Sequence, residues 1–376
     1  MKNEYVSKQE LELLPKRLLL AMETEASKKF EQLLNSLKIK KNYSPFFKVL
    51  VVGSGGSYPA AVFAKYVISE GYGNPYTEAV TPQTAKRILT QFDSSSSFNN
   101  VHNPSYDLII GISYSGKTHD IVALAKLCAQ RDYPFVLITG ADENSLKGIY
   151  SSEIKIISYF NPNDDTGKEK GMISMFSTLA PCVIMNNVSE SLKKDELLYL
   201  GKAKSKVSHY INIKGISKAL KENPIIHVFY EWDTFAAAAD IESKFVESGI
   251  ATVVLHEKKN FTHGRYTLLY KQKFGLIIDL LRHKPGSLAF NTSDTVNYQM
   301  YLSEFLRNTC WNSFSYYLSI SSNLSCFTNW NFEVLALLPY LITEIGIELG
   351  VDISKPYKPH VFPAEAKDLY NYEGEF

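Results

Sequence analysis

Short apolar runs, each followed by a stretch with helical spacing, recur through the first half of the chain. The run FFKVLVV from Phe46 leads through GSGGS into an apolar pattern of helical period from Tyr58 to Ser69. The same order returns over residues 105–130, and YPFVLITG is followed in the same way by residues 141–150. Buried strands that alternate with helices predict a parallel sheet covered by helices on both faces.

A second series of the same character begins near Pro224. PIIHVFY, ATVVLHE, FGLIIDLL and FSYYLSI have the apolar character of strands, and helical spacing covers residues 236–248, 296–307 and 332–349. The chain is therefore predicted to be an α/β protein of two tandem lobes, each a mostly parallel sheet sandwiched by helices in a flavodoxin-like three-layer arrangement. The predicted divisions are a helical lead-in over residues 1–44, a first lobe over 45–200, a second lobe over 201–350 and a C-terminal tail over 351–376.

Composition narrows the class of protein. The 376 residues correspond to roughly two to three domains. With 45% apolar and 21% charged residues, the chain can bury a sizeable core and is not expected to be disordered. Lys and Arg number 40 against 39 Asp and Glu, so the formal charge of +1 provides no field that would attract nucleic acid or an anionic membrane. Neither partner is expected.

Metal sites and export are also not expected. The four cysteines are far apart and form no CxxC pair, which argues against a disulfide framework or a zinc site; they are Cys128, Cys182, Cys310 and Cys326. No metal or other cofactor is predicted. The start MKNEYVSKQE lacks the apolar run of a signal peptide, and the run from Val334 to Leu341 is too short to span a bilayer. These features predict a cytoplasmic protein.

Two loops of small and hydroxyl-bearing residues follow neighbouring strands of the first lobe. They are residues 53–57, GSGGS, and residues 113–118, SYSGKT. Ligands bind at the carboxyl edge of an open parallel sheet, where helix N-termini point their positive ends outward. Glycines let backbone NH groups approach a phosphate, and the hydroxyls can donate to its oxygens. The alternative is that the serines and Thr118 only cap helices, which two adjacent loops of this kind make less favourable.

A nucleotide site is a competing interpretation. GISYSGKT satisfies the pattern GxxxxGK followed by Ser or Thr, comes after a predicted strand and opens a predicted helix. Asp279, at the end of FGLIID, would then be the acid that holds magnesium. The motif is short, however, and it explains neither GSGGS nor the second lobe.

Three segments together, VVGSGGSYPAAVFAKY, GISYSGKTHDIVALA and GKEKGMISMFSTLA, resemble the ligand loops of the sugar isomerase (SIS) domain family. The tandem arrangement resembles the isomerase half of glucosamine-fructose-6-phosphate aminotransferase and stand-alone phosphosugar isomerases and deglycases. The resemblance implies that the first two loops hold the phosphate and the third lies beside the sugar. The residues implied are Gly55, Gly56, Ser57, Ser113, Tyr114 through its backbone, Ser115, Thr118, Met172 through its backbone, and Ser174.

The second lobe supplies the implied acid and base. Asp240 and Glu247 lie seven residues apart, hence on one face of the predicted helix. The resemblance implies that Glu247, in KFVESG, moves a proton between sugar C1 and C2, that Asp240 is a further acid, and that His263, in an HG dipeptide, opens the sugar ring. Burial can raise a carboxyl pKa toward the useful range, and imidazole exchanges protons near neutral pH. Taken alone, Glu247 would be read as a solvated helix acid and His263 as an ordinary loop histidine.

Several positions depart from the family pattern. The family has Gln or Asn at Tyr114 and Glu at Lys117, and its third motif continues Ser-Thr-Lys where this chain has Ser-Met-Phe from Ser174. These changes affect sugar recognition more than phosphate binding. The chain begins MKNEY, without the cysteine that follows the initiator methionine in the glutaminase half, so glutamine-dependent amidotransfer is not expected.

The resemblance also implies a homodimer with composite active sites, because the family histidine reaches into the neighbouring subunit. A lysine of the C-terminal segment closes the family pocket. Lys355, Lys358 and Lys367 are the candidates, and their spacing does not choose among them; Lys367 is the working assignment. The tail could equally pack against the lobes without entering a site.

The sequence therefore favours a phosphosugar isomerase, or an aminosugar-phosphate deaminase or deglycase, acting through an enediol-type intermediate. The first alternative is a catalytically silent protein that binds a sugar phosphate and regulates a partner. The second is a P-loop NTPase.

Overall fold

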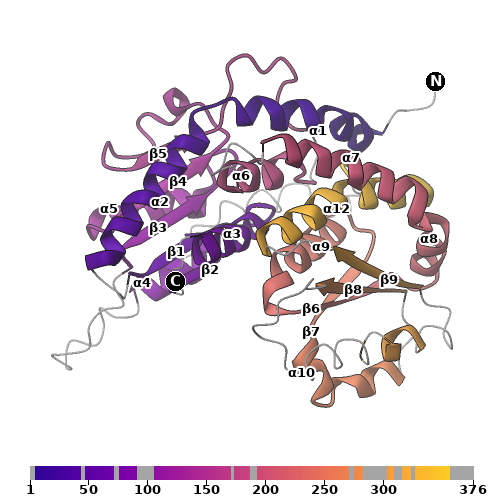
Figure 1. Ribbon diagram of the computed structural model, residues 1–376. Helices are drawn as coiled ribbons and strands as arrows, with labels where there is room; N and C mark the ends of the chain where they lie inside the picture. Colours follow the sequence, from indigo (N-terminus) through magenta and orange to yellow (C-terminus); the bar gives the residue numbers. More distant parts are fainter. Residues whose placement is uncertain are drawn as a thin grey trace, which may run out of the picture. The chain divides into compact units, whose positions relative to one another are not determined.

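The computed structural model describes residues 5–43, 47–71, 76–90, 106–170, 173–186, 193–270, 275–282, 302, 304–308, 316–322 and 327–355 (Figure 1). Its described residues form two compact units. The first-sheet unit comprises Arg17–Gly167 and Ala180–Val188, and the second-sheet unit comprises the residues before Arg17, Lys168–Leu179 and Ser189–Lys355. Helices α1 (Val6–Met22) and α6 (Phe176–Asn186) contribute residues to both units.

The first sheet has five parallel strands in the order β2-β1-β3-β4-β5. Their bounds are β1 Val49–Val52, β2 Thr77–Val80, β3 Leu108–Ile112, β4 Phe135–Thr139 and β5 Lys155–Ser158. All residues of β1, β3 and β4 are buried, which explains why these strands are continuous apolar runs. The chain leaves β1 toward one edge of the sheet and returns to build the other, so the topological switch point lies between β1 and β3.

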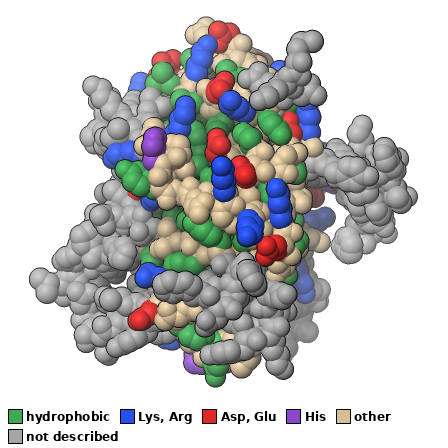
Figure 2. Space-filling model, turned by 90° about the vertical axis from the view of Figure 1, so that its right-hand side faces the viewer, with side chains coloured by type: hydrophobic (Ala, Val, Ile, Leu, Met, Phe, Trp, Pro, Cys, Tyr) green, Lys and Arg blue, Asp and Glu red, His purple; other side chains and the backbone are tan. Residues whose placement is uncertain are grey.

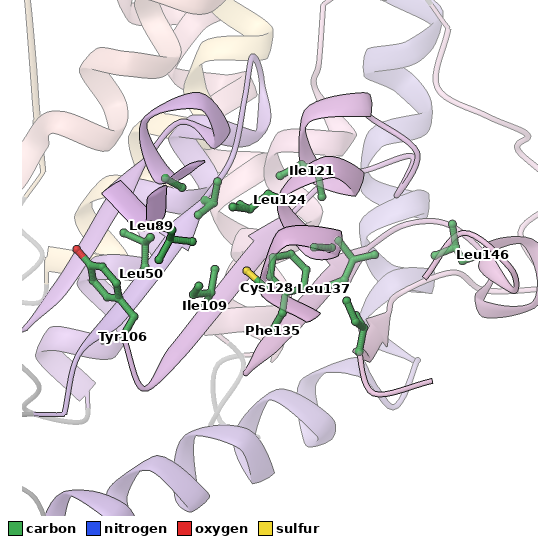
Figure 3. Close-up of a cluster of buried hydrophobic side chains, with 14 residues drawn as sticks. Leu50, Leu89, Tyr106, Ile109, Ile121, Leu124, Cys128, Phe135, Leu137 and Leu146 are labelled. Atoms are coloured by element: carbon green, nitrogen blue, oxygen red, sulfur yellow. The ribbon is translucent and has the colours of Figure 1, made fainter. Parts of the chain in front are cut away.

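Helices cover both faces of this sheet. One face packs against α4 (Pro82–Thr90) and α5 (His119–Gln130): Leu50 and Ile109 from the strands meet Leu89 and Leu124 from the helices in one buried cluster (Figure 3). Side chains alternate along a strand, so the residues directly before and after Leu50 and Ile109 point to the opposite face of the sheet. Helix α3 (Ser57–Tyr66) packs on β1, β2 and β3, and α2 (Ala26–Tyr43) packs on β5.

The second sheet repeats the start of this order. Its described strands are parallel and lie in the order β7-β6-β8-β9, with β6 Ile225–Tyr230, β7 Thr252–Glu257, β8 Leu276–Arg282 and β9 Tyr316–Ser322. The helices of this unit include α7 Lys193–Tyr210, α8 Ile213–Glu222, α9 Phe235–Glu247, α10 Lys258–Thr262 and α12 Phe327–Leu349. Helix α12 packs against α7, α8 and α9. The predicted fold class, two α/β lobes of flavodoxin-like type, is confirmed.

Some local predictions differ from the structure. A helix was expected after β4, but the chain forms only a 3₁₀ turn, η2 (Glu143–Leu146). The Asp142 carboxylate accepts a hydrogen bond from the Asn144 NH, which starts the turn, and Gly148 has a positive φ of 84° soon after it. Strands β2 and β5 were missed because they are four residues long and only partly buried. The polar segment 92–100 lies outside the described residues.

The surface is consistent with the nearly neutral charge. On the face shown in Figure 2, basic and acidic side chains are interspersed among polar and apolar ones. Among the helices that the structure describes, none combines the length and apolarity needed to cross a membrane.

Candidate functional site

The two hydroxyl-rich loops lie side by side at the switch point of the first sheet. They follow β1 and β3, which are hydrogen-bonded neighbours, with Val52 opposite Gly111 in the parallel register. Each loop opens directly into a helix, α3 after the first and α5 after the second. The loop after β1 is residues 53–57, and the loop after β3, residues 113–118, is called the SYSGKT loop below. Their position is the one where open α/β sheets bind ligands.

Hydrogen bonds within the SYSGKT loop bring its hydroxyl groups together. Ser113 is buried, and its Oγ lies 2.9 Å from Thr118 Oγ1. The Lys117 NH donates to Ser115 Oγ at 3.1 Å. In the described part of the chain, the backbone NH groups of Ser115 and Thr118 have no protein acceptor. Hydroxyl and NH donors are thus concentrated at the start of α5, where the helix dipole favours an anion.

The loop after β1 requires glycine at two of its positions. A Cβ at Gly53 would lie 2.3 Å from the Ser57 carbonyl oxygen, and Gly55 has a positive φ of 51°. The half-buried Ser57 is the first residue of α3, and its NH donates to the Ser54 carbonyl at 3.0 Å. These constraints fix the backbone of the loop and the position of Ser57 at the start of α3.

The structure also tests the simpler interpretation, in which the hydroxyls only cap helices. The N-cap of α3 is Gly56, which has no side chain, and the N-cap of α5 is Thr118, whose side chain makes no capping hydrogen bond. Neither N-cap residue therefore closes its helix start with its own side chain. At the corresponding junction after β6, Glu231 and Thr234 form a capping box on the 3₁₀ turn η4 (Trp232–Thr234) that precedes α9. The side chain of Thr234, the N-cap of α9, makes no capping hydrogen bond to that helix.

The acid predicted on α9 lies in a cluster of charged and polar groups. Asp240 is completely buried and forms an ion pair with Lys244, one turn further along the helix. Burial raises the pKa of Asp240, the Lys244 ammonium opposes this rise, and Glu247 adds to it. The Ser243 hydroxyl donates to Glu247 Oε1 at 2.6 Å, and the Glu247 side chain is half-buried. Asp240, Lys244 and Glu247 therefore follow one another along one side of α9.

Two residues of this unit were missed by sequence reasoning. Lys244 is 2% exposed and is held by Asp240 four residues before it, a spacing that the sequence already contained. Glu169 binds the start of α6: its carboxylate accepts from the NH groups of Met175, Phe176 and Ser177 at 2.7, 2.6 and 3.1 Å. Glu169 lies in GKEKGM, a segment that the resemblance already included. Its role was missed because it is seven residues before the start of α6.

The remaining predicted residues are placed differently. His263 is exposed at the C-terminal end of α10, and among the described residues no hydrogen bond or ion pair joins it to Glu247. Ser174 precedes α6 in the second-sheet unit, where its carbonyl accepts from the Thr178 hydroxyl. Lys355 is exposed, with its NH bonded to the Asp352 carbonyl. Met172, Lys358 and Lys367 lie outside the described residues.

Asp279 is not placed as the nucleotide interpretation requires of a magnesium ligand. Asp279, considered as a magnesium ligand, is completely buried in β8 and forms an ion pair with Lys258 at 2.8 Å. The Tyr317 hydroxyl also donates to this carboxylate at 2.8 Å. The oxygens of Asp279 are thus bound within the protein. No group of three or more His, Cys, Asp or Glu side chains suited to a metal ion occurs in the described ranges.

The first sheet is doubly wound, so the chain belongs to the α/β class of proteins. The two hydroxyl-rich loops at its switch point are suited to a small anionic ligand. Sequence comparison finds a match to the SIS domain model over residues 102–178, which include the SYSGKT loop. A phosphoheptose isomerase from Geobacter sp. (strain M21) is 26% identical over 149 residues, covering 36% of this chain and 73% of that protein.

Solved structures extend the likeness to both sheets. The C-terminal domain of glucosamine-fructose-6-phosphate aminotransferase from Francisella tularensis superimposes with a TM-score of 0.64 at 16% identity, covering 94% of this chain and 99% of that one. Glucosamine-6-phosphate deaminase from Thermotoga maritima gives 0.59 at 15% identity, covering 94% and 98%. The predicted resemblance is confirmed: residues 102–178 match the SIS domain model, and the chain shares its fold with these two structures over nearly its whole length.

Proposed function

We propose that this protein is an aldose–ketose isomerase of phosphorylated sugars, or a closely related enzyme that removes the amine from an aminosugar phosphate. The observation that carries the proposal is the pair of open loops after β1 and β3, the second of which lies within the SIS match. The similar proteins, an isomerase, a deaminase and the C-terminal domain of an aminotransferase, are named for sugar phosphates.

The loops are suited to a phosphate monoester dianion. Ser57, Ser113, Ser115 and Thr118 can donate hydroxyl hydrogen bonds, and Gly55 and Gly56 let the backbone approach the oxygens. The peptide NH that follows Tyr114, which is that of Ser115, has no protein acceptor in the described chain and can donate as well. This donor set explains an affinity for the phosphate but does not select the sugar. Ser174 and Met172 are proposed to lie beside the sugar, on the strength of the resemblance.

The proposed chemistry is a proton transfer between adjacent carbons. Glu247 takes a proton from the carbon next to the carbonyl, the carbonyl oxygen gains a proton to give an enediol, and Glu247 returns its proton to the former carbonyl carbon. The hydroxyl on the neighbouring carbon loses its proton and becomes the new carbonyl, so one carbon-bound and one oxygen-bound proton move in the same direction. No atom is gained or lost in isomerisation. Asp240 and Lys244 fix the charge next to this carboxylate, and His263 is proposed to open the sugar ring. In a deaminase the corresponding intermediate is an enolamine: return of the proton to the former carbonyl carbon leaves an imine, which water hydrolyses to the ketone with release of ammonia.

We further propose a cytoplasmic homodimer in which His263 serves the site of the partner chain. The exposure of His263, and its lack of any bond to Glu247 in the described chain, are compatible with this arrangement. Lys367 remains the proposed lysine of the closing C-terminal segment.

The decisive variant is Glu247→Gln, which keeps the size of the side chain and removes its basicity. A panel of hexose and hexosamine phosphates is first screened by thermal shift, since a ligand that binds the folded state raises its melting temperature. We expect wild-type protein to convert at least one binding sugar phosphate, with solvent deuterium entering at carbon, and Glu247→Gln to bind it without turnover.

Glu242→Gln is the matched control, because Glu242 is a half-buried acid of the same helix whose pKa is also raised by burial. It should retain turnover. Binding without turnover by wild-type protein would instead identify the silent regulatory alternative, and magnesium-dependent ATP binding that is lost in Lys117→Ala would identify an NTPase.

A further inference from the structure

The SYSGKT loop is hydrogen-bonded to the end of β4 and to the segment that follows it. The Tyr114 carbonyl accepts from Thr139 Oγ1 at 3.1 Å and from the Gly140 NH at 3.0 Å. Two residues further along, the Gly116 carbonyl accepts from the Tyr150 hydroxyl at 2.6 Å. Both carbonyl anchors lie on the side of the loop that faces β4 and η2.

The turn at Gly116 fits closely against this segment. Gly116 has a positive φ of 61°, and a Cβ there would lie 2.9 Å from Thr139 Oγ1 and 3.1 Å from each terminal methyl of Leu146. Leu146 is buried at the end of η2. The loop therefore has little room to move toward β4 and η2.

The two anchored carbonyls fix the peptide NH groups on the other side. A trans peptide is planar, so its NH points opposite to its C=O. Fixing the Tyr114 carbonyl fixes the NH of Ser115, which has no protein acceptor among the described residues. Fixing the Gly116 carbonyl fixes the NH of Lys117, which donates to Ser115 Oγ. The Ser115 oxygen then accepts from within the loop, and its hydroxyl hydrogen is left to donate outward.

We propose that Tyr150 is a positioning residue of the phosphate site, acting through the Gly116–Lys117 peptide on the orientation of Ser115. The proposal rests on the function proposed above. Tyr150 does not itself contact the phosphate; it lies 34 residues from Gly116 in sequence, and its hydroxyl orders the loop before ligand arrives. Burial raises the pKa of Tyr150 to about 12, so the hydroxyl remains a donor at neutral pH.

The test compares Tyr150→Phe with Tyr106→Phe. Tyr106 is a matched control from the same unit: its hydroxyl donates to Glu78 at 3.1 Å, and burial raises its pKa to about 12 as well. Affinities for inorganic phosphate and for a binding sugar phosphate are measured by calorimetry, and hydrogen exchange is followed at residues 114–118. We expect Tyr150→Phe to weaken both affinities about 5- to 10-fold, the effect of one lost neutral hydrogen bond. Exchange should be faster at Lys117, whose NH is bonded to Ser115 Oγ, and Tyr106→Phe should match wild type in affinity and in exchange.

Kinetics separate positioning from general damage. Tyr150→Phe should raise KM while leaving kcat near the wild-type value, because the reacting carbons are not touched. If Tyr150→Phe does not fold, Thr139→Val removes the other side-chain hydrogen bond to the loop, from Thr139 Oγ1 to the Tyr114 carbonyl, and is tested in the same way.

Three outcomes would contradict the inference in different ways. Unchanged affinity and exchange in Tyr150→Phe, with a wild-type protein that binds, would overturn the role of Tyr150 alone. An equal loss in Tyr106→Phe would show that any buried hydroxyl of this unit matters, and would also overturn it. A wild-type protein that binds neither phosphate nor any sugar phosphate would end the proposed function and this role with it.

Discussion

At the scale of single residues, the candidate site depends on where hydroxyls and amides point. The sequence indicates the residue types, because GSGGS and SYSGKT gather glycine and hydroxyl groups after predicted strands. It does not indicate which groups are already bonded within the protein. The Ser115 oxygen accepts from the Lys117 NH, and Tyr150 reaches the same turn from a distant segment. Tyr150 and Glu169 were missed because their roles arise only when the chain has folded.

Removal of one hydroxyl from the SYSGKT loop should weaken phosphate binding directly. Ser115→Ala is expected to cost about 1.5 to 3 kcal/mol of binding free energy, the range for hydrogen bonds to a charged group. Calorimetry with a binding sugar phosphate measures the loss. Ser36→Ala is the control, since Ser36 is exposed on α2 and its hydroxyl donates to the Leu33 carbonyl at 2.6 Å. Equal affinities in wild type and Ser115→Ala would contradict the assignment of this loop.

At the scale of elements, the sequence predicted those that are fully buried and missed those that are not. Strands β1, β3 and β4 are buried along their whole length and were found as apolar runs. Strand β2 has the sequence TEAV and β5 has KIIS, and neither exposes a clear alternation. The helix predicted after β4 was wrong: the bond from the Asn144 NH to Asp142 starts only a 3₁₀ turn, which ends at Leu146, shortly before Gly148 with its positive φ of 84°. Packing partners, which the sequence alone does not name, decide these short elements.

A pair of histidines joins β6 and β7 inside the second-sheet unit. His227 Nδ1 and His256 Nε2 lie 2.8 Å apart, and the Phe229 and Phe261 rings contact His256. A hydrogen bond between two ring nitrogens needs one of them to accept, so at most one ring can be charged. Burial lowers the pKa of both histidines to about 4, with His256 adding to the effect on His227 and Arg265 to that on His256. Both rings are therefore neutral at pH 7.

This pair predicts a loss of stability in mild acid. The unfolded histidines have the ordinary pKa of 6.5, so the unfolded chain binds protons first as the pH falls. The contribution of the neutral pair to stability is complete above pH 6.5 and is lost progressively toward pH 4. Urea unfolding between pH 7.5 and 5 should show it. His256→Gln, which can keep a hydrogen bond without titrating, should reduce the slope, whereas the exposed variant His263→Gln should not; identical slopes in all three proteins would contradict the prediction.

At the scale of the whole molecule, the proposed enzyme depends on residues from separate parts of the sequence. The loops proposed to hold the phosphate belong to the first-sheet unit, and the proposed acid and base belong to the second-sheet unit. The strand order was predictable in kind because alternating strands and helices permit few arrangements. The identity of the sugar was not, because the shape of its binding pocket depends on side chains that the loop motifs do not specify.

A composite dimer makes a specific prediction about mixtures. Glu247→Gln and His263→Ala should each be inactive as homodimers. A heterodimer of the two variants should regain roughly half of one wild-type dimer's activity if Glu247 and His263 of different chains act together, because one of its two sites then has both groups intact. Heterodimers purified with two affinity tags allow the measurement. Activity absent from verified heterodimers would show that each chain supplies both residues to its own site.

The order β2-β1-β3-β4 in one sheet recurs as β7-β6-β8-β9 in the other. The two sheets therefore share one topology, while the residues that follow their first strands differ: GSGGS comes after β1 and EWDT after β6. Only the first of these segments has the glycines that let backbone NH groups approach an anion. Units of the same topology thus offer different chemistry at equivalent positions.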